Sequence, residues 1–299
     1  MPDVKIGIIG IPGKWSTETL ADSVAAKTGF RLVVDMQRVV LELEKQKPGR
    51  LFYDGQNLCS LDALIVKKIS TIYSPNTLDR LELLRIAERA GVKVFSRAEN
   101  ILRLIDRLSC TITLKNNDIP MPETCITEDI ETAIVAVENF SSAVFKPLYS
   151  TKAQGMCVIE SNENKSLIEQ QVRNFHSHNP MMYIQKKIES LSQDLGLVFM
   201  GGKYQGAYAR ISKDNSWNTT IDSGGHYADC QPGDDIIALA ERAQAPFYLD
   251  FTTVDVAETE AGPIVFEVSA FGGFRGSLEG GGIHMADRYV DYVLLNLGK

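Results

Sequence analysis

Long hydrophobic runs are missing from this 299-residue sequence, and so is a basic N-terminus followed by a small-residue cleavage site. A bilayer-spanning helix needs about 20 apolar residues, and a secretory signal needs that N-terminal pattern. We therefore expect no membrane span, no secretory signal and a cytoplasmic location. An excess of positive charge is also missing, because the formal net charge is −7 and basic residues are scattered. This balance argues against nucleic acid or anionic lipid as a partner.

Paired cysteines and clustered histidines are scarce as well. The five cysteines show no CxxC spacing, which is typical of reduced thiols rather than of a disulfide framework or a zinc site. The four histidines contain one HxH pair, His176 and His178, without a third ligand nearby. What is present is an ordinary globular composition, in a chain long enough for two or three compact units with buried cores.

The first 97 residues alternate between short apolar runs and segments with helical character. After the opening strand, Ser16 is expected to cap a helix and Gly29 to end it. A second helix is expected from about 78 to 90, between two further apolar strands. The pattern predicts a small α/β domain with a mostly parallel sheet.

From residue 98 the strands come largely as antiparallel hairpins, with turns expected at Gly201-Gly202 and Ala261-Gly262. One helix is expected over about 99–115, and a final helix from about residue 283. This part of the chain, 98–299, is therefore predicted to be α+β rather than a second doubly wound sheet.

Residues 7–16 read GIIGIPGKWS and resemble a phosphate-binding loop. A dinucleotide fingerprint needs a second glycine where the chain has Ile8 or Ile11, and a P-loop needs glycine and a hydroxyl where it has Ile8 and Trp15. Both motifs fail at residues that their mechanisms require. We expect a glycine-rich strand-to-helix turn, with a substrate contact from the helix N-terminus as the alternative.

A better phosphate site lies in VFKPLYSTKAQG, where Lys146 ends a predicted strand and a polar loop with Lys152 and Gly155 follows. A lysine aimed at phosphate oxygens under a backbone-rich loop suits a triphosphate. The short strand IQKKI could read an adenine edge with its backbone, and Asp194 follows within plausible reach of a ribose.

Two carboxylates stand out in TVDVAET and VFEVSAF, on the two strands of one predicted hairpin. Asp255 and Glu267 are each flanked by apolar residues, so we expect both to project from the same buried face. Carboxylates in such a setting are costly unless they are neutralised, and a divalent metal is the simplest explanation.

Taken in order, these motifs resemble the ATP-grasp superfamily, and within it the RimK-like carboxylate–amine ligases. A weaker similarity points to the GAK-system ATP-grasp proteins. The resemblance covers nearly the whole chain and implies an α/β N-terminal domain over 1–97 followed by an ATP-grasp domain over 98–299. Two subdomains, about 98–185 and 186–299, would hold ATP between them.

The resemblance also implies site residues. Those matched to ATP contacts are Arg107, Lys146, Lys152, Gly155, Gln185, Lys187, Ile188 and Asp194. Arg210 matches an arginine that steadies the acyl-phosphate step, and Asp255 and Glu267 match two magnesium ligands. The third ligand is normally asparagine, whereas this chain has Ser269, a shorter and weaker ligand. Arg275, in a glycine-rich segment, is a candidate for binding a substrate carboxylate.

The implied reaction is an ATP- and Mg²⁺-dependent ligation of a carboxylate to an amino-acid amine, with Mn²⁺ as an alternative metal and a homo-oligomer as a common family state. Two alternatives stay open. Ser269 allows a nucleotide-binding sensor or scaffold without ligase activity, and the N-terminal turn allows a dehydrogenase. Structural roles also remain for single residues: Lys146 as a snorkelling lysine, Arg107 as a surface charge and Asp194 as a turn cap.

Overall fold

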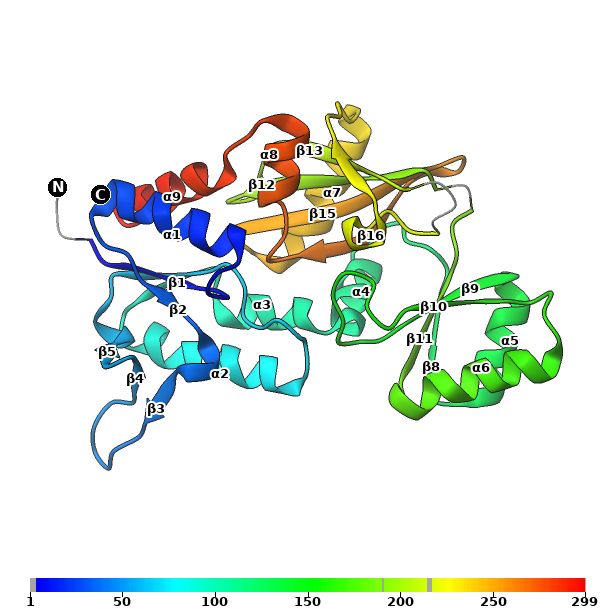
Figure 1. Cartoon of the computed structure of the whole chain (residues 1–299), viewed down its shortest axis with the longest axis horizontal. Helices are drawn as coiled ribbons and strands as arrows, with labels where there is room; N and C mark the ends of the chain where they lie inside the picture. The colour runs from blue at the N-terminus through cyan, green and yellow to red at the C-terminus, as the bar shows by residue number, and fades with distance from the viewer. Residues whose placement is uncertain (1–3, 190, 214–216, 299) are drawn as a thin grey trace.

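The structure is a computed structural model that describes residues 4–189, 191–213 and 217–298. The N-terminal part contains a parallel four-stranded sheet in the order β2-β1-β6-β7. Helices α1 and α2 lie on opposite sides of it (Figure 1). Every residue of β1 and β6 is buried, as expected for strands covered on both faces. The bounds are β1 (Ile6–Ile9), α1 (Trp15–Thr28), β2 (Val33–Val34), β6 (Ala63–Val66), α2 (Pro75–Arg89) and β7 (Lys93–Phe95).

The predicted N-terminal helices exist, but both begin earlier than expected. Helix α1 starts at Trp15, so Ser16 lies inside it rather than capping it, whereas Gly29 ends it with a φ of 75° as predicted. Helix α2 starts at Pro75, because Ser74 and Thr77 form a capping box. A small antiparallel sheet projects from this part of the molecule (Figure 1); its strands are β3 (Val40–Glu42), β4 (Arg50–Tyr53) and β5 (Gln56–Asn57).

The single helix expected over 99–115 is wrong, because two helices meet at Asp106. They are α3 (Ala98–Ile105) and α4 (Arg107–Asn116). The backbone of Asp106 is extended, and its carboxylate accepts a hydrogen bond from the Leu108 N–H at 2.9 Å. An aspartate that caps a following helix in this way ends the preceding one. As a result, Arg107 is the first residue of α4.

A second four-stranded sheet, antiparallel and ordered β10-β9-β11-β8, forms a separate lobe with α5 and α6 (green, Figure 1). Its own hydrophobic cluster centres on Phe145 and Val172. The elements are β8 (Thr124–Thr127), α5 (Ile130–Phe140), β9 (Ser142–Lys146), β10 (Cys157–Glu160), α6 (Lys165–His178) and β11 (Met182–Lys186).

The C-terminal sheet has five antiparallel strands in the order β14-β13-β12-β15-β16. Both predicted hairpins are confirmed, the second with its turn one residue earlier than expected. The glycine-rich segment that carries Arg275, for which no helix was predicted, forms helix α8. The elements are β12 (Gln193–Met200), β13 (Lys203–Ile211), β14 (His226–Ala228), α7 (Asp234–Gln244), β15 (Phe251–Thr259), β16 (Gly262–Ser269), α8 (Phe274–Gly281) and α9 (Met285–Asn296).

The glycines of α8 are explained by its closeness to β13. A Cβ atom on Gly276 would lie 2.4 Å from the Tyr208 ring, and one on Gly280 would lie 2.8 Å from the Cβ of Tyr208. Helix α8 can therefore pack on the Tyr208 side chain only because these two positions have no side chain. Spacing the glycines four residues apart places them on one face of the helix.

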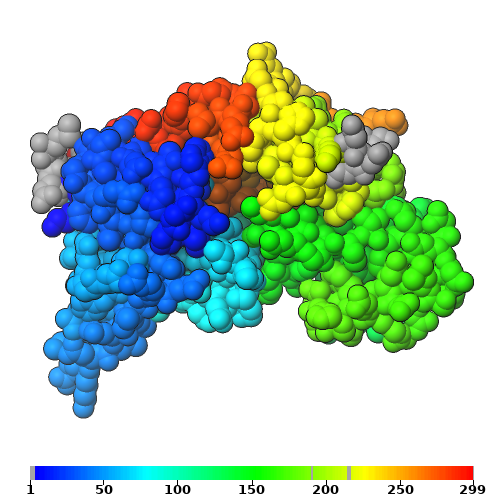
Figure 2. Space-filling model, in the orientation of Figure 1, coloured from blue at the N-terminus to red at the C-terminus, as the bar shows by residue number. Residues whose placement is uncertain are grey.

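The two ends of the chain share one core. Helix α9 packs on α1, and Tyr289 and Val293 of α9 belong to the same buried cluster as Ile6 and Ile8 of β1. This packing joins the parallel sheet to the C-terminal sheet and leaves a concave region where both meet the green lobe (Figure 2). None of the helices in the described part of the chain has the length and apolar character that crossing a bilayer requires.

Candidate active site

One large cavity, about 870 Å³, lies where the three larger sheets meet. In Figure 2 atoms of β16 (brown) lie at the bottom of a hollow bordered by dark blue, yellow and green segments. Twelve of the thirteen predicted site residues line this cavity: Arg107, Lys146, Lys152, Gln185, Lys187, Ile188, Asp194, Arg210, Asp255, Glu267, Ser269 and Arg275. Gly155 does not line it. Its φ of 71° instead serves the turn before β10.

The carboxylate pair lies at the centre of the hairpin β15/β16. Asp255 and Glu267 are direct partners across the two strands, so they project from the same face, as predicted. A β-bulge follows them, because Val256 pairs with Val265 and leaves Phe266 unpaired. The bulge lets Phe266 as well as Glu267 face the cavity. The sequence alternation alone does not reveal this extra residue.

Arg210 joins two acidic side chains. Its guanidinium binds the Asp194 carboxylate in bidentate fashion, with an Nε–Oδ1 distance of 3.1 Å, and approaches the Asp255 carboxylate to 2.8 Å. Although burial lowers the pKa of Arg210, the two facing carboxylates raise it well above its usual value. Burial raises the pKa of Asp255 to about 6 against the opposing charge of Arg210. A metal cation beside Asp255 would stabilise its charged form further and lower this pKa.

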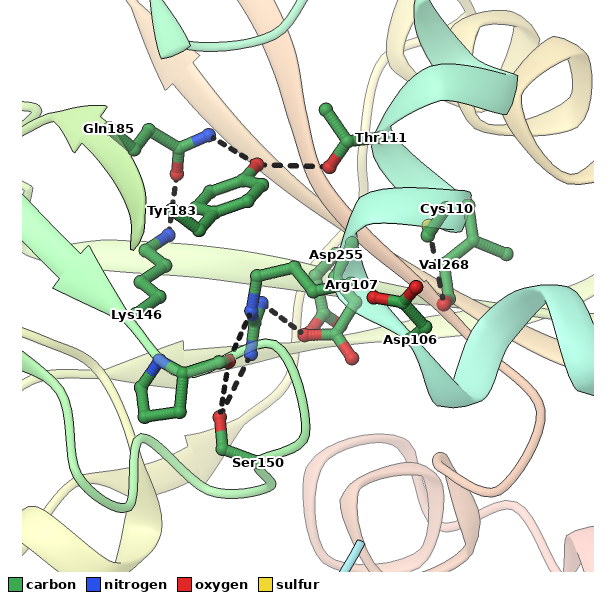
Figure 3. A network of polar contacts seen from close by, with 12 residues as sticks. Asp106, Arg107, Cys110, Thr111, Lys146, Ser150, Tyr183, Gln185, Asp255 and Val268 are labelled. Carbon is green, nitrogen blue, oxygen red and sulfur yellow. Dashed lines mark hydrogen bonds and ion pairs between the residues drawn. The ribbon is translucent and has the colours of Figure 1, made fainter. Parts of the chain in front are cut away.

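Arg107 is held by the break between α3 and α4. Its side chain is only 10% exposed, and its Nη1 lies 3.5 Å from Oε2 of Glu267. Nε donates to the Pro147 carbonyl at 3.4 Å, and Nη2 donates to the Ser150 hydroxyl at 3.3 Å (Figure 3). Arg107 therefore ties the loop after β9 to β16. It is not a surface charge.

Lys146 reaches into the cavity from the end of β9. Its ammonium donates to Oε1 of Gln185 at 2.5 Å, and the Gln185 amide donates in turn to the Tyr183 hydroxyl at 3.2 Å (Figure 3). Burial lowers the pKa of Lys146 to about 7; the neighbouring Arg107 acts in the same direction and Glu267 opposes both. The group thus lies where a phosphate would restore its positive charge.

The loop between β9 and β10 covers one side of the cavity. Lys152 has a φ of 59° and its Nζ lies 3.1 Å from both carboxylate oxygens of Asp222. Both side chains are largely exposed. This contact connects the loop to the segment around residue 222, so one ion pair bridges the cavity mouth.

Lys187 and Ile188 lie just beyond β11. The Lys187 amide donates to the Ser142 carbonyl at 2.9 Å, and its ammonium lies 3.3 Å from Glu189 and 3.7 Å from Glu160. The N–H of Lys187 is therefore already bonded. An adenine edge at this point would have to use other backbone groups of the segment.

The N-terminal turn is a strand-to-helix turn, as expected, and its residues from Lys14 to Thr17 line the cavity. Two of its amide donors are taken internally: Ile11 donates to the Thr17 hydroxyl at 3.2 Å, and Gly13 donates to the Glu18 carboxylate at 2.6 Å. The glycine at position 10 is needed because a Cβ there would lie 2.4 Å from Thr17. Packing explains this glycine without a nucleotide.

Sequence reasoning missed two lysines that follow β6, Lys67 and Lys68. The buried Lys67 ammonium donates to the carbonyls of Phe271 at 2.6 Å and Gly272 at 3.2 Å. Lys68 is half-buried, lines the cavity and donates to the Tyr73 hydroxyl at 3.1 Å. Their position at the carboxyl end of a parallel strand, where ligands bind in α/β sheets, was the available signal.

A divalent metal suits the oxygen atoms of this site. No group of three His, Cys, Asp or Glu side chains that could hold a metal occurs among the described residues. Asp255 and Glu267 supply two carboxylates, and the Ser269 hydroxyl lies two residues along β16, opposite Thr253. Oxygen-only ligands are those that Mg²⁺ prefers, usually completed by water and substrate phosphates. The residues fit a metal that is bound together with a nucleotide.

Two relatives match nearly the whole chain. The tetrahydromethanopterin:α-L-glutamate ligase of Methanosarcina acetivorans is 26% identical, over 97% of this chain and 98% of its own. A probable α-L-glutamate ligase of Thioalkalivibrio sulfidiphilus is 25% identical, over 98% and 96%. These likenesses extend through the N-terminal part as well as the hairpins.

A solved structure supports the fold. The ATP-grasp ligase PsnB, in complex with a phosphomimetic variant of its minimal precursor, Mg and ADP, superposes with a TM-score of 0.76. It is 17% identical, and the match covers 99% of each chain. The ATP-grasp fold expected from the sequence is thereby confirmed. Because the model of the RimK-like ATP-grasp domain matches residues 105–293, more than half of the chain, this protein belongs to the RimK-like ATP-grasp family.

Proposed function

We propose that the chain joins a carboxylate to the amine of an acidic amino acid such as L-glutamate, through an acyl-phosphate intermediate. Family membership makes it an ATP-dependent ligase that forms carbon–nitrogen bonds. The observation that carries the finer proposal is the cavity itself, where the facing Asp255 and Glu267 carboxylates lie among Arg107, Lys146 and Arg210. The names of the relatives support glutamate as the amine.

ATP is proposed to lie between the subdomains 98–185 and 186–299, with the domain 1–97 on the acceptor side. Lys146 and Arg107 would contact phosphate oxygens, under the loop that carries Lys152. The end of β11 would lie beside the adenine. Asp194 would approach the ribose with a carboxylate already oriented by Arg210.

Asp255, Glu267 and Ser269 would hold the metal. Mg²⁺ held there would supply positive charge that neutralises the terminal phosphates, and Mn²⁺ would suit the same oxygen ligands. The hydroxyl of Ser269 is a weaker ligand than the carboxylates. It also accepts a hydrogen bond from the Phe271 amide at 3.3 Å, which fixes its position beside Glu267.

The chemistry requires two transfers. A carboxylate oxygen of the first substrate attacks the γ-phosphorus of ATP and ADP leaves; the amine nitrogen of the second substrate then attacks the acyl carbon and phosphate leaves. Lys146 and Arg107 would stabilise charge on the phosphate oxygens in the first step. Arg210 would donate to the oxyanion in the second. The Lys152–Asp222 contact would help to keep the loop closed. Closure matters because water that enters the cavity would hydrolyse the acyl phosphate.

The test is calorimetric titration of Mg-ATP into the wild-type protein, Lys146→Ala and Glu267→Gln. Lys203→Ala and Glu258→Gln are matched controls, because both side chains are exposed and lie outside the cavity. We expect metal-dependent binding that both site variants weaken and both controls retain. Equal binding by all five proteins would refute the site, and binding of NADH instead would favour the dehydrogenase alternative.

Activity is tested separately. We expect ADP release from Mg-ATP that depends on an added carboxylate together with L-glutamate. Mg-ATP binding without ADP release, across a panel of carboxylate and amine pairs, would favour the alternative of a nucleotide-binding sensor or scaffold, which Ser269 in place of asparagine allows.

A further inference from the structure

The cavity contains two half-buried lysines that have no acidic partner within 4.0 Å among the described residues, Lys146 and Lys68. Lys146 comes from the antiparallel lobe and is assigned to the phosphates. Lys68 comes from the opposite wall, directly after β6 of the parallel sheet. Both line the same cavity as Asp255 and Glu267. The site therefore has a lysine on each of two sides of this carboxylate pair.

The surroundings of Lys68 leave its ammonium available to a ligand. The ammonium donates a hydrogen bond to the neutral Tyr73 hydroxyl at 3.1 Å. The nitrogen also lies 4.5 Å from the centre of the Tyr73 ring and 5.5 Å from that of Phe271. Aromatic faces and one hydroxyl compensate an ammonium only partly when it leaves water. An anionic group of a substrate would complete the set of partners.

Lys67 keeps this wall in place. Both lysines line the cavity, but Lys67 donates to the carbonyls of residues 271 and 272 whereas Lys68 donates to the Tyr73 hydroxyl. The loop that Lys67 holds connects β16, with Glu267 and Ser269, to α8. Lys68 thus directly follows a residue that is tied to the loop after Glu267 and Ser269.

We propose that Lys68 binds a carboxylate of the amino-acid substrate, with the Tyr73 hydroxyl orienting its ammonium. An acidic amino acid that reacts through its amine keeps two carboxylates that do not react, and both need a cation in a partly desolvated site. Arg275, on α8 beyond the same loop, is the candidate for the other one. This inference rests on the proposed ligase function and names one of its specificity-determining residues.

The test measures binding of L-glutamate to protein saturated with Mg-ADP, by calorimetry, for the wild type, Lys68→Met, Lys68→Arg and the control Lys203→Met. A charged hydrogen bond lost from a cavity weakens binding by roughly ten- to a hundredfold. We expect that loss in Lys68→Met, with at least partial recovery in Lys68→Arg and none of it in the control. The affinity for Mg-ADP should change less than about twofold, which also shows that the variant is folded.

Two amides identify the carboxylate. L-Glutamine lacks the side-chain carboxylate and L-isoglutamine lacks the α-carboxylate. The wild type should bind both more weakly than L-glutamate, and Lys68→Met should lose its discrimination against one of them. A variant that weakens Mg-ADP instead would assign Lys68 to phosphate and overturn the proposal. Unchanged L-glutamate affinity, or no L-glutamate binding by a wild type that binds Mg-ADP, would overturn it too. Failure of Mg-ADP to bind at all would count against the proposed function itself.

Discussion

The two walls of the cavity are built from contacts of very different range. On the C-terminal wall, Asp255 and Glu267 face each other on adjacent strands of one hairpin. On the N-terminal wall, Lys67 meets the carbonyl of Phe271, 204 residues away along the chain. A hairpin shows itself in the sequence as alternation around a turn, whereas a contact of that range leaves no local pattern. The C-terminal wall was therefore predictable from the sequence and the N-terminal wall was not.

Removing charge from the C-terminal wall should have the largest effect. In Asp255→Asn a neutral amide replaces a carboxylate that pairs with Arg210 and is proposed to bind the metal. We expect the turnover number for ADP release to fall by roughly a hundred- to a thousandfold, as for loss of a group that stabilises the transition state. Glu258→Gln, on the same strand and exposed, should keep wild-type turnover. Turnover within tenfold of wild type would mean that the C-terminal wall is not the catalytic one.

Changing the N-terminal wall should lower the free energy of unfolding. Lys67→Met leaves the carbonyls of the half-buried Phe271 and Gly272 without their donor, which costs about 1–3 kcal/mol. The Lys67 ammonium also lies 4.1 Å from the centre of the Phe274 ring, so the substitution removes this cation–π contact as well as the hydrogen bonds. Chemical denaturation would measure it. An unfolding free energy equal to that of the wild type would show that the lysine does not tie the walls together.

The same contrast explains what the sequence could and could not predict of the fold. The hairpins and the pairing of Asp255 with Glu267 followed from alternation and turn residues. The break at Asp106 was missed because an aspartate inside an apolar-periodic segment is compatible with one helix until its side chain caps the next. Helix α8 was missed because glycine disfavours helices locally, and only the Tyr208 side chain shows why glycine is required.

The cavity shows the same limit at single residues. Lys146 was found as a lysine that ends a predicted strand before a polar loop, whereas Arg107 and Arg210 were found only through the resemblance to a family. Phe266 reaches the cavity through a bulge, and a bulge depends on the register of the partner strand rather than on the residue itself. Lys68 was missed because its surroundings are formed by the parallel sheet and the loop after β16, which are far apart in the sequence.

The pH dependence of nucleotide binding should distinguish the antiparallel lobe from the two walls. Because the Lys146 pKa is lowered to about 7, this group is mostly neutral at pH 8 and charged below pH 7. Phosphate favours the charged form, so Mg-ATP binding at pH 8 should take up a proton, and affinity should fall by up to about tenfold per pH unit above 7. Calorimetry at pH 8 in two buffers of different ionisation enthalpy measures the uptake. Lys146→Met should reduce it, and an uptake unchanged by that substitution would assign the proton to another group.

The smallest effect is expected where the loop after β9 meets the segment around residue 222. The Lys152 and Asp222 side chains are 65% and 48% exposed, and ion pairs in such positions contribute about 0–1 kcal/mol. Asp222→Asn should therefore leave the unfolding free energy nearly unchanged. Its effect should appear instead as ADP release without product, because a loop that closes less often admits water to the acyl phosphate. The ratio of ADP to ligated product measures this directly. A ratio equal to that of the wild type would mean that the loop is closed by its contacts with substrate and not by this ion pair.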